Sequence, residues 1–277
     1  MSSISFVIFT KNEENRIGYV IRNFIKYGEV LVFDDGSTDK TEDVVKAAGG
    51  QYILRPKSDA MYVERQDMYN FIKPYLKTDW IYWGYADNMA SKILLDKISE
   101  VIIDGNIKYV RVPLYTYLYG NTKIPMFKGY APMFFRKDYI DFTDNIIHGM
   151  GKFIGKKNEI LTLPSREEYA IRHYSLYDMK KFVLNHLRYA EAEAQSKFER
   201  GKKFSIFLMI GAMIRYLVLF YKFSFRNGVK GLVVALMYSY FRLMVYAKLY
   251  ELENGISLES IEADFIESRE KILNDIE

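Results

Sequence analysis

Cysteine is absent from this chain of 277 residues, which also contains only 3 histidines and 6 prolines. The absence of cysteine excludes disulfide bonds, thiolate catalysis and cysteine-ligated zinc. Three histidines without cysteine are also too few for the usual four-ligand structural zinc site. A chain without disulfides is compatible with a reducing cytoplasm.

Several sequence signals are missing as well. The first residues show no basic region followed by an apolar stretch and a cleavage site, so we expect no signal peptide. Neither a GxGxxG motif nor the lysine of a P-loop is present, which argues against a dinucleotide-binding or P-loop protein. Hydrophobic residues make up 49% of the chain, with 24 tyrosines and 19 phenylalanines, so a folded core is predicted.

An acidic loop follows a short apolar run near the N-terminus. Residues 30–33 (VLVF) have the length and branched side chains of a strand buried on both faces. Residues 34–39 (DDGSTD) come directly after it, where open α/β sheets bind ligands. Aspartate there can accept hydrogen bonds from a base or ribose. The same residues also fit a plain strand-to-helix turn, with Ser37 or Asp39 as the helix N-cap.

The preceding segment favours the ligand site. Residues 4–9 form a second buried-strand run and end in the polar loop 10–14 (TKNEE). A helical pattern follows, with apolar residues on one face at Ile17, Val20, Ile21, Phe24 and Ile25. Residues 4–39 therefore have the strand–helix–strand layout of a nucleotide-binding unit.

The two loop motifs, at this separation and both at strand ends, resemble those of family 2 glycosyltransferases of the GT-A fold. Members begin with a strand ending in a T-x-N-E-like loop and a second strand ending in D-D-G-S-x-D. The chain is similar to bacterial lipopolysaccharide-core and capsule glucosyltransferase-like members, strongly at these motifs and loosely beyond residue 90. The resemblance implies an α/β fold, a Rossmann-like mixed sheet flanked by helices. It also implies transfer of a sugar from a nucleotide donor, expected to be UDP-linked, with inversion at the anomeric carbon.

A change of composition near Tyr174 divides the chain. Before it, strands are predicted near residues 52–54, 80–85, 109–112 and 133–136, and helices at 41–48, 61–73 and 93–103. Loops around residues 113–131 are expected to shape the pocket for sugar and acceptor. After Tyr174 the helical period dominates. We therefore predict a GT-A domain at residues 1–173 and an all-helical region at residues 174–277.

The resemblance implies a set of donor-binding residues. Arg65, on the predicted helix before the fourth strand, would approach the diphosphate, although Gln66 replaces the asparagine that usually follows it in the family. The alternative for Arg65 is an exposed side chain paired with Glu64 or Asp67. The nucleoside would be held by the loop residues Thr10, Glu13, Asp34 and Asp35.

A divalent cation site is implied at the end of the fourth strand. The family carries an Asp-x-Asp there, which holds Mg²⁺ or Mn²⁺ against the diphosphate. This chain has Tyr85-Ala86-Asp87, so only the second acid is present and metal use is expected to be weak or optional. His173 is similar to a histidine that can reach the metal or diphosphate. Alternatively, Asp87 is a helix N-cap, as Asn88 or Ser91 could also be, and His173 is structural.

The catalytic base is sought in residues 141–149. The lipopolysaccharide-core members carry a His-Glu pair in this stretch, but this chain has His148-Gly149. Asp144 is the nearest substitute carboxylate, Asp141 is the next, and His148 can itself act as a base at neutral pH. A helix cap at Asp144 and a structural role for His148 stay open as alternatives.

The C-terminal region contains two apolar helical segments, residues 204–225 and 229–249. Every charged side chain between residues 201 and 250 is basic, whereas residues 251–277 are rich in acids. Arg215 lies in the middle of the first segment and disfavours a spanning helix. We expect a peripheral helical hairpin at the cytoplasmic face of the cell membrane, with a homodimer interface as the main rival. Nucleic acid is not expected as a partner.

The implied acceptor is a cell-envelope glycan or a lipid-linked glycan. Two other functions stay open at this point. Loss of the first metal acid and of the His-Glu carboxylate also fits a catalytically decayed protein that only binds a nucleotide sugar. A sugar-phosphate nucleotidyltransferase shares the sheet and crevice, but it would need a glycine-rich, lysine-bearing loop that residues 10–13 do not supply.

Overall fold

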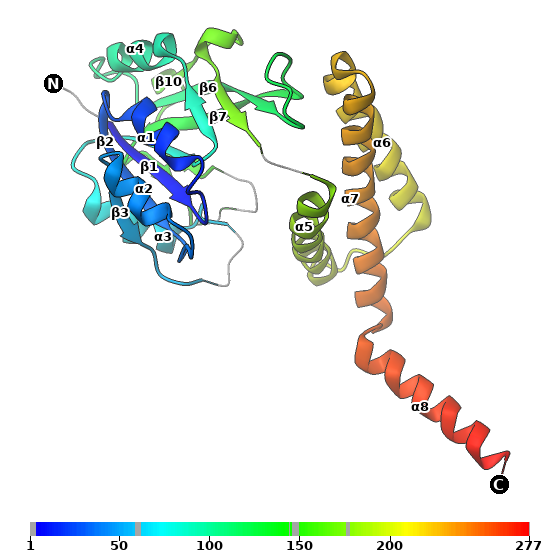
Figure 1. Cartoon of the computed structure of the whole chain (residues 1–277). Coiled ribbons are helices and arrows are strands. Elements are labelled where there is room, and N and C mark those ends of the chain that lie inside the picture. The colour runs from blue at the N-terminus through cyan, green and yellow to red at the C-terminus, as the bar shows by residue number, and fades with distance from the viewer. Residues whose placement is uncertain (1–3, 59–61, 144, 146–149, 176–177, 277) are drawn as a thin grey trace. The chain divides into compact units, whose positions relative to one another are not determined.

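The computed structural model describes residues 4–58, 62–143, 145, 150–175 and 178–276. The chain forms two compact units, Met1–Ser175 and Leu176–Glu277 (Figure 1). The first unit combines a β-sheet with helices, and the described part of the second consists of helices and turns. This is the α/β fold with an all-helical C-terminal region that the sequence predicts.

The first unit is built on a mixed sheet, which has nine strands among the described residues. The strand order is β3-β2-β1-β4-β7-β6-β11-β5, and β10 pairs with β6 outside this path. The strands are β1 (Ile4–Thr10), β2 (Gly28–Asp34), β3 (Gln51–Leu54), β4 (Trp80–Tyr85), β5 (Asn88–Ala90), β6 (Tyr109–Tyr117), β7 (Phe127–Arg136), β10 (Ile160–Thr162) and β11 (Ile171–Tyr174). A separate pair joins β8 (Ile140–Asp141) to β9 (Lys152–Phe153).

Strand direction changes midway across the sheet. Strand β1 pairs in parallel with β2 and with β4, and β2 pairs in parallel with β3. Strand β7 is antiparallel to both of its neighbours, β4 and β6, while β11 is parallel to β6. The carboxyl ends of β1, β2 and β4 therefore meet at one edge, where ligands bind in open α/β sheets.

Helices cover both faces of this sheet. The helices of this unit are α1 (Ile17–Phe24), α2 (Thr41–Ala47), α3 (Gln66–Ile72) and α4 (Lys92–Val101), with short 3₁₀ turns η1 (Lys73–Tyr75), η2 (Lys157–Glu159) and η3 (Glu167–Tyr169). Side chains of α1, α2 and α4 join one core cluster, whereas those of α3 join the other. Alternation along β1 supplies both clusters, because neighbouring strand residues point to opposite faces.

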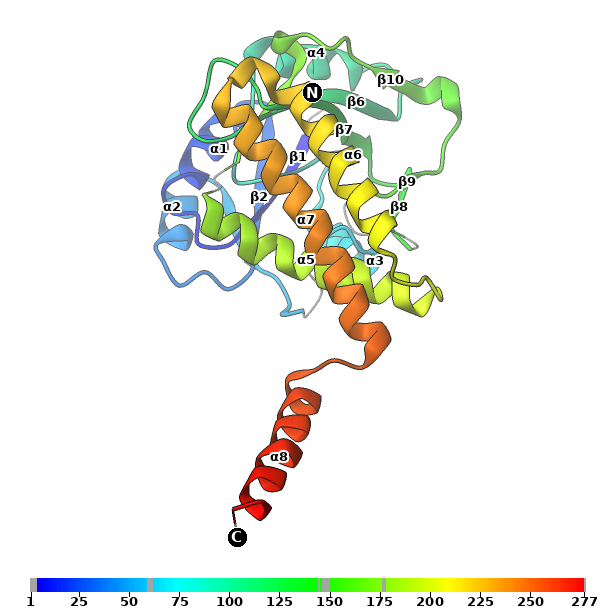
Figure 2. The ribbon, with the colours of Figure 1, turned by 90° about the vertical axis from the view of Figure 1, so that its right-hand side faces the viewer.

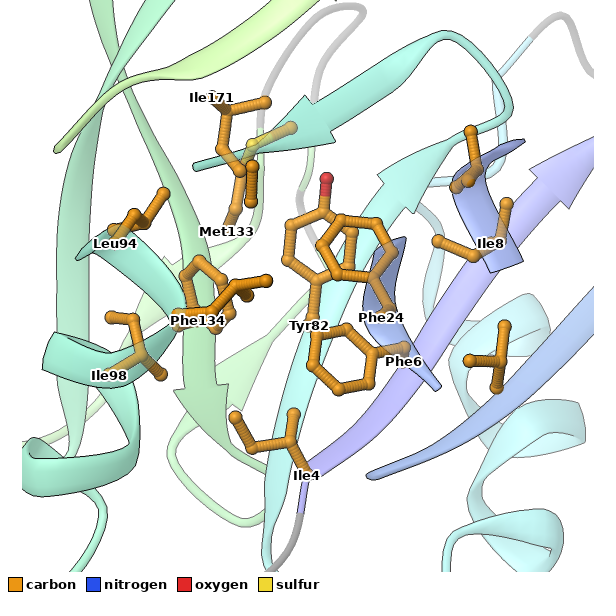
Figure 3. Packing of buried hydrophobic residues seen from close by; sticks show 14 of the residues in the cluster. Ile4, Phe6, Ile8, Phe24, Tyr82, Leu94, Ile98, Met133, Phe134 and Ile171 are labelled. Atoms are coloured by element: carbon orange, nitrogen blue, oxygen red, sulfur yellow. The ribbon is translucent and has the colours of Figure 1, made fainter. Parts of the chain in front are cut away.

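Aromatic rings fill the centre of the first cluster. Phe6 of β1 stacks on Phe24 of α1 with ring centroids 4.7 Å apart. Tyr82 of β4 lies 4.9 Å from Phe24 and 4.9 Å from Phe134 of β7 (Figure 3). Burying aromatic rings of this size contributes a large share of core stability. The packing fixes β1 and β4 side by side, and with them the edge that carries the acidic loops.

Strands β6 and β7 are longer than the sequence predicts. The predicted strands covered only residues 109–112 and 133–136, with loops between them, but β6 and β7 pair along most of residues 109–136. Proline lacks a backbone donor and is uncommon inside a sheet. In the structure Pro113 stays in the strand opposite Tyr130, after a register shift between Val110 and Val112. The expectation of loops around residues 113–131 is therefore wrong for residues 113–117 and 127–131, which belong to β6 and β7, and holds only for residues 118–126 between them.

The helix predicted over residues 61–73 is also shorter in the structure. Helix α3 begins only at Gln66, and Arg65 precedes it in an extended conformation, with φ −131° and ψ 153°. The prediction that Arg65 lies on the helix is therefore wrong. The short strands β5 and β11 escaped prediction because three or four residues are too few to show a period.

The second unit contains helices α5 (Met179–Glu199), α6 (Ile206–Ser224), α7 (Val229–Asn254) and α8 (Leu258–Asn274), with a 3₁₀ turn η4 (Phe225–Asn227). Helices α6 and α7 run side by side as a hairpin (Figures 1 and 2). The turn is tight: a Cβ on Gly231 would lie 2.1 Å from the carbonyl oxygen of Ser224. The Ser224 hydroxyl donates to the carbonyls of Phe220 and Gly231, at 2.8 and 2.9 Å.

Helix α7 also packs on α5, and an ion pair between the buried Arg242 and the partly exposed Glu193 joins them. The Arg242 guanidinium donates to both carboxylate oxygens of Glu193, at 2.9 and 2.8 Å. Burial alone would raise the pKa of Glu193, but the hydrogen bonds and charge of Arg242 outweigh it and leave that pKa lowered. The charge of Arg242 is therefore paired within the helical unit.

Candidate functional site

Acidic and hydroxyl side chains meet at the carboxyl edge of β1, β2 and β4. Thr10, the last residue of β1, pairs with Asp34, the last residue of β2. On the other side of β1, Phe9 pairs with Tyr85 at the end of β4, and the Ala86 amide donates to the Phe9 carbonyl at 3.2 Å. The structure thus brings together the predicted strand-end residues of three neighbouring strands.

The two loops that follow β1 and β2 are joined by hydrogen bonds. The Asn12 amide donates to the Ser37 hydroxyl at 2.7 Å, and the Asn12 side-chain oxygen accepts from the Thr38 amide at 2.8 Å. The Glu13 amide donates to the Thr41 hydroxyl at 2.8 Å. Gly36 has φ +74°, a left-handed conformation that favours glycine. The loop after β1, residues 10–14, and the loop after β2, residues 34–39, therefore form one continuous rim along this edge of the sheet.

Asp34 is fully buried, and its hydrogen bonds stabilise the loop after β2. One carboxylate oxygen accepts from the Ser37 amide at 2.6 Å and from the Tyr52 hydroxyl at 3.0 Å, and the other accepts from the Ser37 hydroxyl. Burial, with the hydrogen bond and charge of Asp34, raises the pKa of Tyr52 to about 12. These contacts give Asp34 a structural role in the loop besides the predicted nucleoside contact.

Asp35 lies between two basic side chains. Arg55 contacts one carboxylate oxygen at 2.9 Å, and Lys11 contacts the other at 3.0 Å. The sequence reading overlooked Arg55, which directly follows β3. The position of Arg55 in the sequence could have predicted this contact, because the residue that follows a third parallel strand lies next to the residue that follows the second. This cluster supplies both signs of charge beside the crevice.

Asp87 and His173 face each other across the loop after β4. His173 Nε2 lies 3.1 Å from Asp87 Oδ2, and His173 Nδ1 lies 3.4 Å from the Thr116 hydroxyl oxygen. Strand β11 brings the histidine here, because it pairs with β5 and places His173 opposite Asn88. The Tyr174 amide donates to the Asp87 carbonyl at 2.9 Å. Helix α4 is capped by Ser91, which accepts from the Leu94 amide, so Asp87 is not that N-cap.

Two oxygens at this edge are buried without a hydrogen-bond partner among the described residues, namely Thr10 Oγ1 and Asp87 Oδ1. Buried polar atoms are nearly always paired with protein, water or a bound group. Such unsatisfied acceptors at a strand-end crevice are typical of a site that a ligand completes. No group of three or more histidine, cysteine, aspartate or glutamate residues within the described chain could hold a metal by itself.

Tyr85 stands where the family's first metal acid is expected, and it contacts a second carboxylate. Its hydroxyl donates to Oε1 of Glu64, a buried residue just before α3. Burial raises the pKa of the Glu64 carboxyl. From the sequence, Glu64 was considered only as a partner for Arg65. The absence of an acid at residue 85 was the one feature of the sequence that indicated another carboxylate near this position.

Arg65 is engaged within its own segment. Its guanidinium donates to both oxygens of Asp67, one of them at 2.9 Å, and to the Ser58 hydroxyl at 2.6 Å. The hydrogen bond to Asp67 raises the pKa of Arg65. Glu13, another predicted nucleoside contact, pairs with Arg16 at the start of α1. Both side chains would have to exchange these partners to contact a donor.

The predicted bases Asp144 and His148 lie outside the described residues. Asp141 is described, and its carboxylate accepts from the Thr143 amide at 2.9 Å and from the Thr143 hydroxyl at 2.6 Å. These hydrogen bonds lower the pKa of Asp141. A carboxylate with a lowered pKa is a weaker general base at neutral pH. The structure therefore disfavours Asp141, the second substitute considered from the sequence.

The chain is similar to known proteins over more than half of its length. The model of glycosyl transferase family 2 matches residues 5–161. An uncharacterized glycosyltransferase of Rickettsia typhi is 29% identical over 273 residues, covering 91% of this chain and 88% of the relative. Another from Rickettsia bellii is 28% identical over 263 residues, covering 90% of this chain and 86% of the relative.

Solved structures are more distant. Glucosyl-3-phosphoglycerate synthase from Mycobacterium tuberculosis, in complex with Mn²⁺, uridine diphosphate and glucosyl-3-phosphoglycerate, has 21% identity and a TM-score of 0.32. That likeness covers 43% of this chain and 45% of the synthase, less than half of either. The structure of S. aureus TarS 1–349 has 13% identity and a TM-score of 0.43, over 69% of this chain and 64% of TarS. On the match of the family model over most of the first unit, the chain belongs to glycosyl transferase family 2 and is a glycosyltransferase.

Proposed function

We propose that this glycosyltransferase moves a sugar from a UDP-sugar to a cell-envelope or lipid-linked glycan, with inversion at the anomeric carbon. The single observation that carries the donor site is the pair of buried, unpartnered oxygens of Thr10 and Asp87 at the carboxyl edge of the sheet. Donor binding and transfer are assigned to residues 1–173, and the helical region 174–277 is assigned to location or assembly. UDP and inversion rest on the motif resemblance of residues 10–13 and 34–39.

The donor would lie along the joined rim of the two loops. Thr10 Oγ1 can contribute a hydrogen bond there without giving up a partner within the described chain. Asp35 and Glu13 would contact the nucleoside by loosening their ion pairs with Lys11 and Arg16, which are partly exposed to water. Arg65 would leave Asp67 for the diphosphate, which carries more negative charge than one carboxylate. Asp34 would fix the loop that presents these groups.

Asp87 and His173 are the residues that would hold a divalent cation. Their oxygen and nitrogen atoms lie 3.1 Å apart, and the second Asp87 oxygen is buried and unpartnered. Mg²⁺ and Mn²⁺ sites often use only one or two protein ligands, because phosphate oxygens and water complete the shell. These residues therefore fit such an ion, which when bound would offset the charge on the departing diphosphate. With Tyr85 in place of an acid, we expect weak or optional metal use.

The base that deprotonates the acceptor hydroxyl is proposed to be Asp144 or His148. Asp141 is the less suitable carboxylate because its pKa is lowered. An enzyme acting on lipid-linked glycans with a cytoplasmic nucleotide sugar would work at the inner face of the cell membrane. A homodimer through the helical region is the competing assembly.

Calorimetry of UDP binding with and without Mn²⁺ tests this function. We expect wild-type binding to strengthen when Mn²⁺ is added, and Asp87→Ala and His173→Gln to lose that gain. Asp264→Ala serves as the matched control, because Asp264 is an exposed residue of α8. Removing one metal ligand typically weakens affinity by roughly tenfold or more.

Three results would contradict the proposal. Metal-independent binding that Asp87→Ala leaves unchanged would remove Asp87 from the site. Absence of UDP binding would reject the uridine donor. Normal UDP binding without release of UDP from any UDP-sugar in the presence of envelope glycans would favour a protein that only binds its nucleotide sugar.

A further inference from the structure

Large apolar side chains lie exposed along the outer side of α6. Phe207, Ile214, Val218 and Phe225 follow one another at intervals of seven, four and seven residues, which keeps them on one stripe of the helical path. Their exposed fractions are 83%, 57%, 62% and 55%. We call these four residues the apolar stripe. Ser224 is the only residue of α6 that is buried.

A second stripe of α6 is basic. Arg215, Lys222 and Arg226 follow one another at intervals of seven and four residues, and all three are exposed. Arg215 and Arg226 each come one residue after a member of the apolar stripe, Ile214 and Phe225, and Lys222 comes four residues after Val218. With 3.6 residues per turn, these three residues lie about a quarter of a turn around the helix from the apolar stripe. We call these three residues the basic stripe. Between residues 201 and 250 the sequence contains no acidic residue.

By length and composition alone, the helices Ile206–Asn227 and Val229–Asn254 could each cross a membrane. Their contacts argue against it. Arg215 is exposed in the middle of α6, where a spanning helix would place it at the bilayer centre. The Arg242–Glu193 ion pair joins α7 to α5. If α7 spanned the membrane, the charged helix α5 would be drawn into the bilayer with it. A hairpin lying on the surface avoids both costs.

We propose that α6 lies flat on an anionic lipid surface, with the apolar stripe at the acyl boundary and the basic stripe among the headgroups. The inference rests on the proposed function, because it places the enzyme where a lipid-linked acceptor would be. Charge decides between the occupants of this face. A second copy docking the same face would bring two basic stripes together, which like-charge repulsion opposes. An anionic bilayer offers both negative charge and apolar depth.

Vesicle flotation of the full-length protein tests the proposal. We expect binding to vesicles that contain phosphatidylglycerol and little binding to phosphatidylcholine alone, with a decrease as salt rises. Ile214→Glu should lower the partition coefficient roughly ten- to a hundredfold. Its matched control is Ile103→Glu, the same change at a residue of the first unit that is 74% exposed.

The basic stripe has its own variant and control. Replacing its three residues with glutamine should lower binding to anionic vesicles on the order of a hundredfold. The same replacement at the exposed residues Lys26, Lys156 and Lys157 of the first unit should leave most of the binding intact. UDP binding, measured on every preparation, separates the two proposals: vesicle binding with no UDP binding would reject the donor site alone.

Three outcomes would overturn the inference. One is a folded, UDP-binding protein that does not float with anionic vesicles. A second is self-association in sedimentation experiments that Ile214→Glu abolishes, without vesicle binding, which would make this face an interface between copies. The third is a protein that stays in native membranes after alkaline carbonate extraction, which would show a spanning hairpin.

Discussion

At the scale of single residues, the end of β4 carries less negative charge than the family pattern predicts. Tyr85 takes the place of an acid, and the carboxylate that it contacts, Glu64, is buried with a raised pKa. Glu64 is therefore closer to its neutral form than an exposed glutamate. Asp87 is left as the main acidic side chain at this strand end, which is the physical reason for expecting weak metal binding.

The raised pKa of Glu64 has a consequence for stability against pH. At pH values below 4.5, the ordinary pKa of a glutamate, the Glu64 carboxyl is protonated in both the folded and unfolded states. Its burial then does not lower the free energy of unfolding through ionisation. As pH rises, the unfolded state ionises first, so the free energy of unfolding falls until the folded pKa is passed. We expect Glu64→Gln to be more stable than wild type near pH 8 and equal to it at about pH 4. Urea denaturation at both pH values measures this.

Glu29→Gln is a suitable control for that comparison, because Glu29 is a partly exposed glutamate of the same unit and pairs with Lys77. It should show no gain near neutral pH. A Glu64→Gln protein that is less stable than wild type at high pH would mean that Glu64 is held as a charged partner of the Tyr85 hydroxyl.

At the scale of elements, two glycines of the α6–α7 hairpin have opposite surroundings. A Cβ on Gly211 of α6 would meet nothing within 4 Å, whereas a Cβ on Gly231 of α7 would lie 2.1 Å from the Ser224 carbonyl oxygen. The first glycine only weakens its helix, because glycine loses more backbone freedom on folding than alanine does. The second permits the close approach of the two helices.

Alanine substitution at these glycines should therefore have opposite signs. We expect Gly211→Ala to raise the free energy of unfolding by about 0.5–1 kcal/mol. Gly231→Ala should lower it by about 2 kcal/mol, because the turn must open to accept the methyl group. Thermal denaturation of the two variants beside wild type gives both values. Equal shifts in the same direction would show that the hairpin is not packed as described.

The sequence predicted the elements whose pattern is local. Strands β1, β2 and β4 are buried on both faces, so each is a recognisable apolar run, and their end loops carry the motifs. Pairing between distant short strands leaves no such pattern. Strand β11 pairs with β5 through only a few residues, so the spacing of Asp87 and His173 in the sequence could not predict their contact. A common role for the two residues was implied only by the family resemblance. The Tyr85–Glu64 contact was missed for the same reason.

At the scale of the whole molecule, we propose separate tasks for the two units. The first has its own core clusters on both faces of the sheet, and all the described donor-site residues belong to it. The second contains the basic stripe and the acidic helix α8. Because no described donor-site contact uses a residue of the second unit, nucleotide binding should not depend on it.

A chain ending at Ser175 should therefore fold and bind UDP with Mn²⁺ as tightly as the full protein, within about twofold. A chain ending at Ala170 is the matched comparison, since it lacks β11 and His173 and should lose the metal-dependent gain. Circular dichroism would establish folding, and calorimetry would measure binding. A folded 1–175 fragment without UDP affinity would mean that the helical unit takes part in the donor site.

The position of β11 in the sheet also bears on how the protein is made. Strand β5 follows β4 directly, yet its partner β11 is the last strand of the unit to leave the ribosome. Until then the nascent chain can bury its first strands, but the Asp87 loop lacks its contacts with the Tyr174 amide and the His173 side chain. The pair of side chains proposed to hold the metal would thus be completed in one late step of synthesis, and a product cut short before residue 171 would lack it.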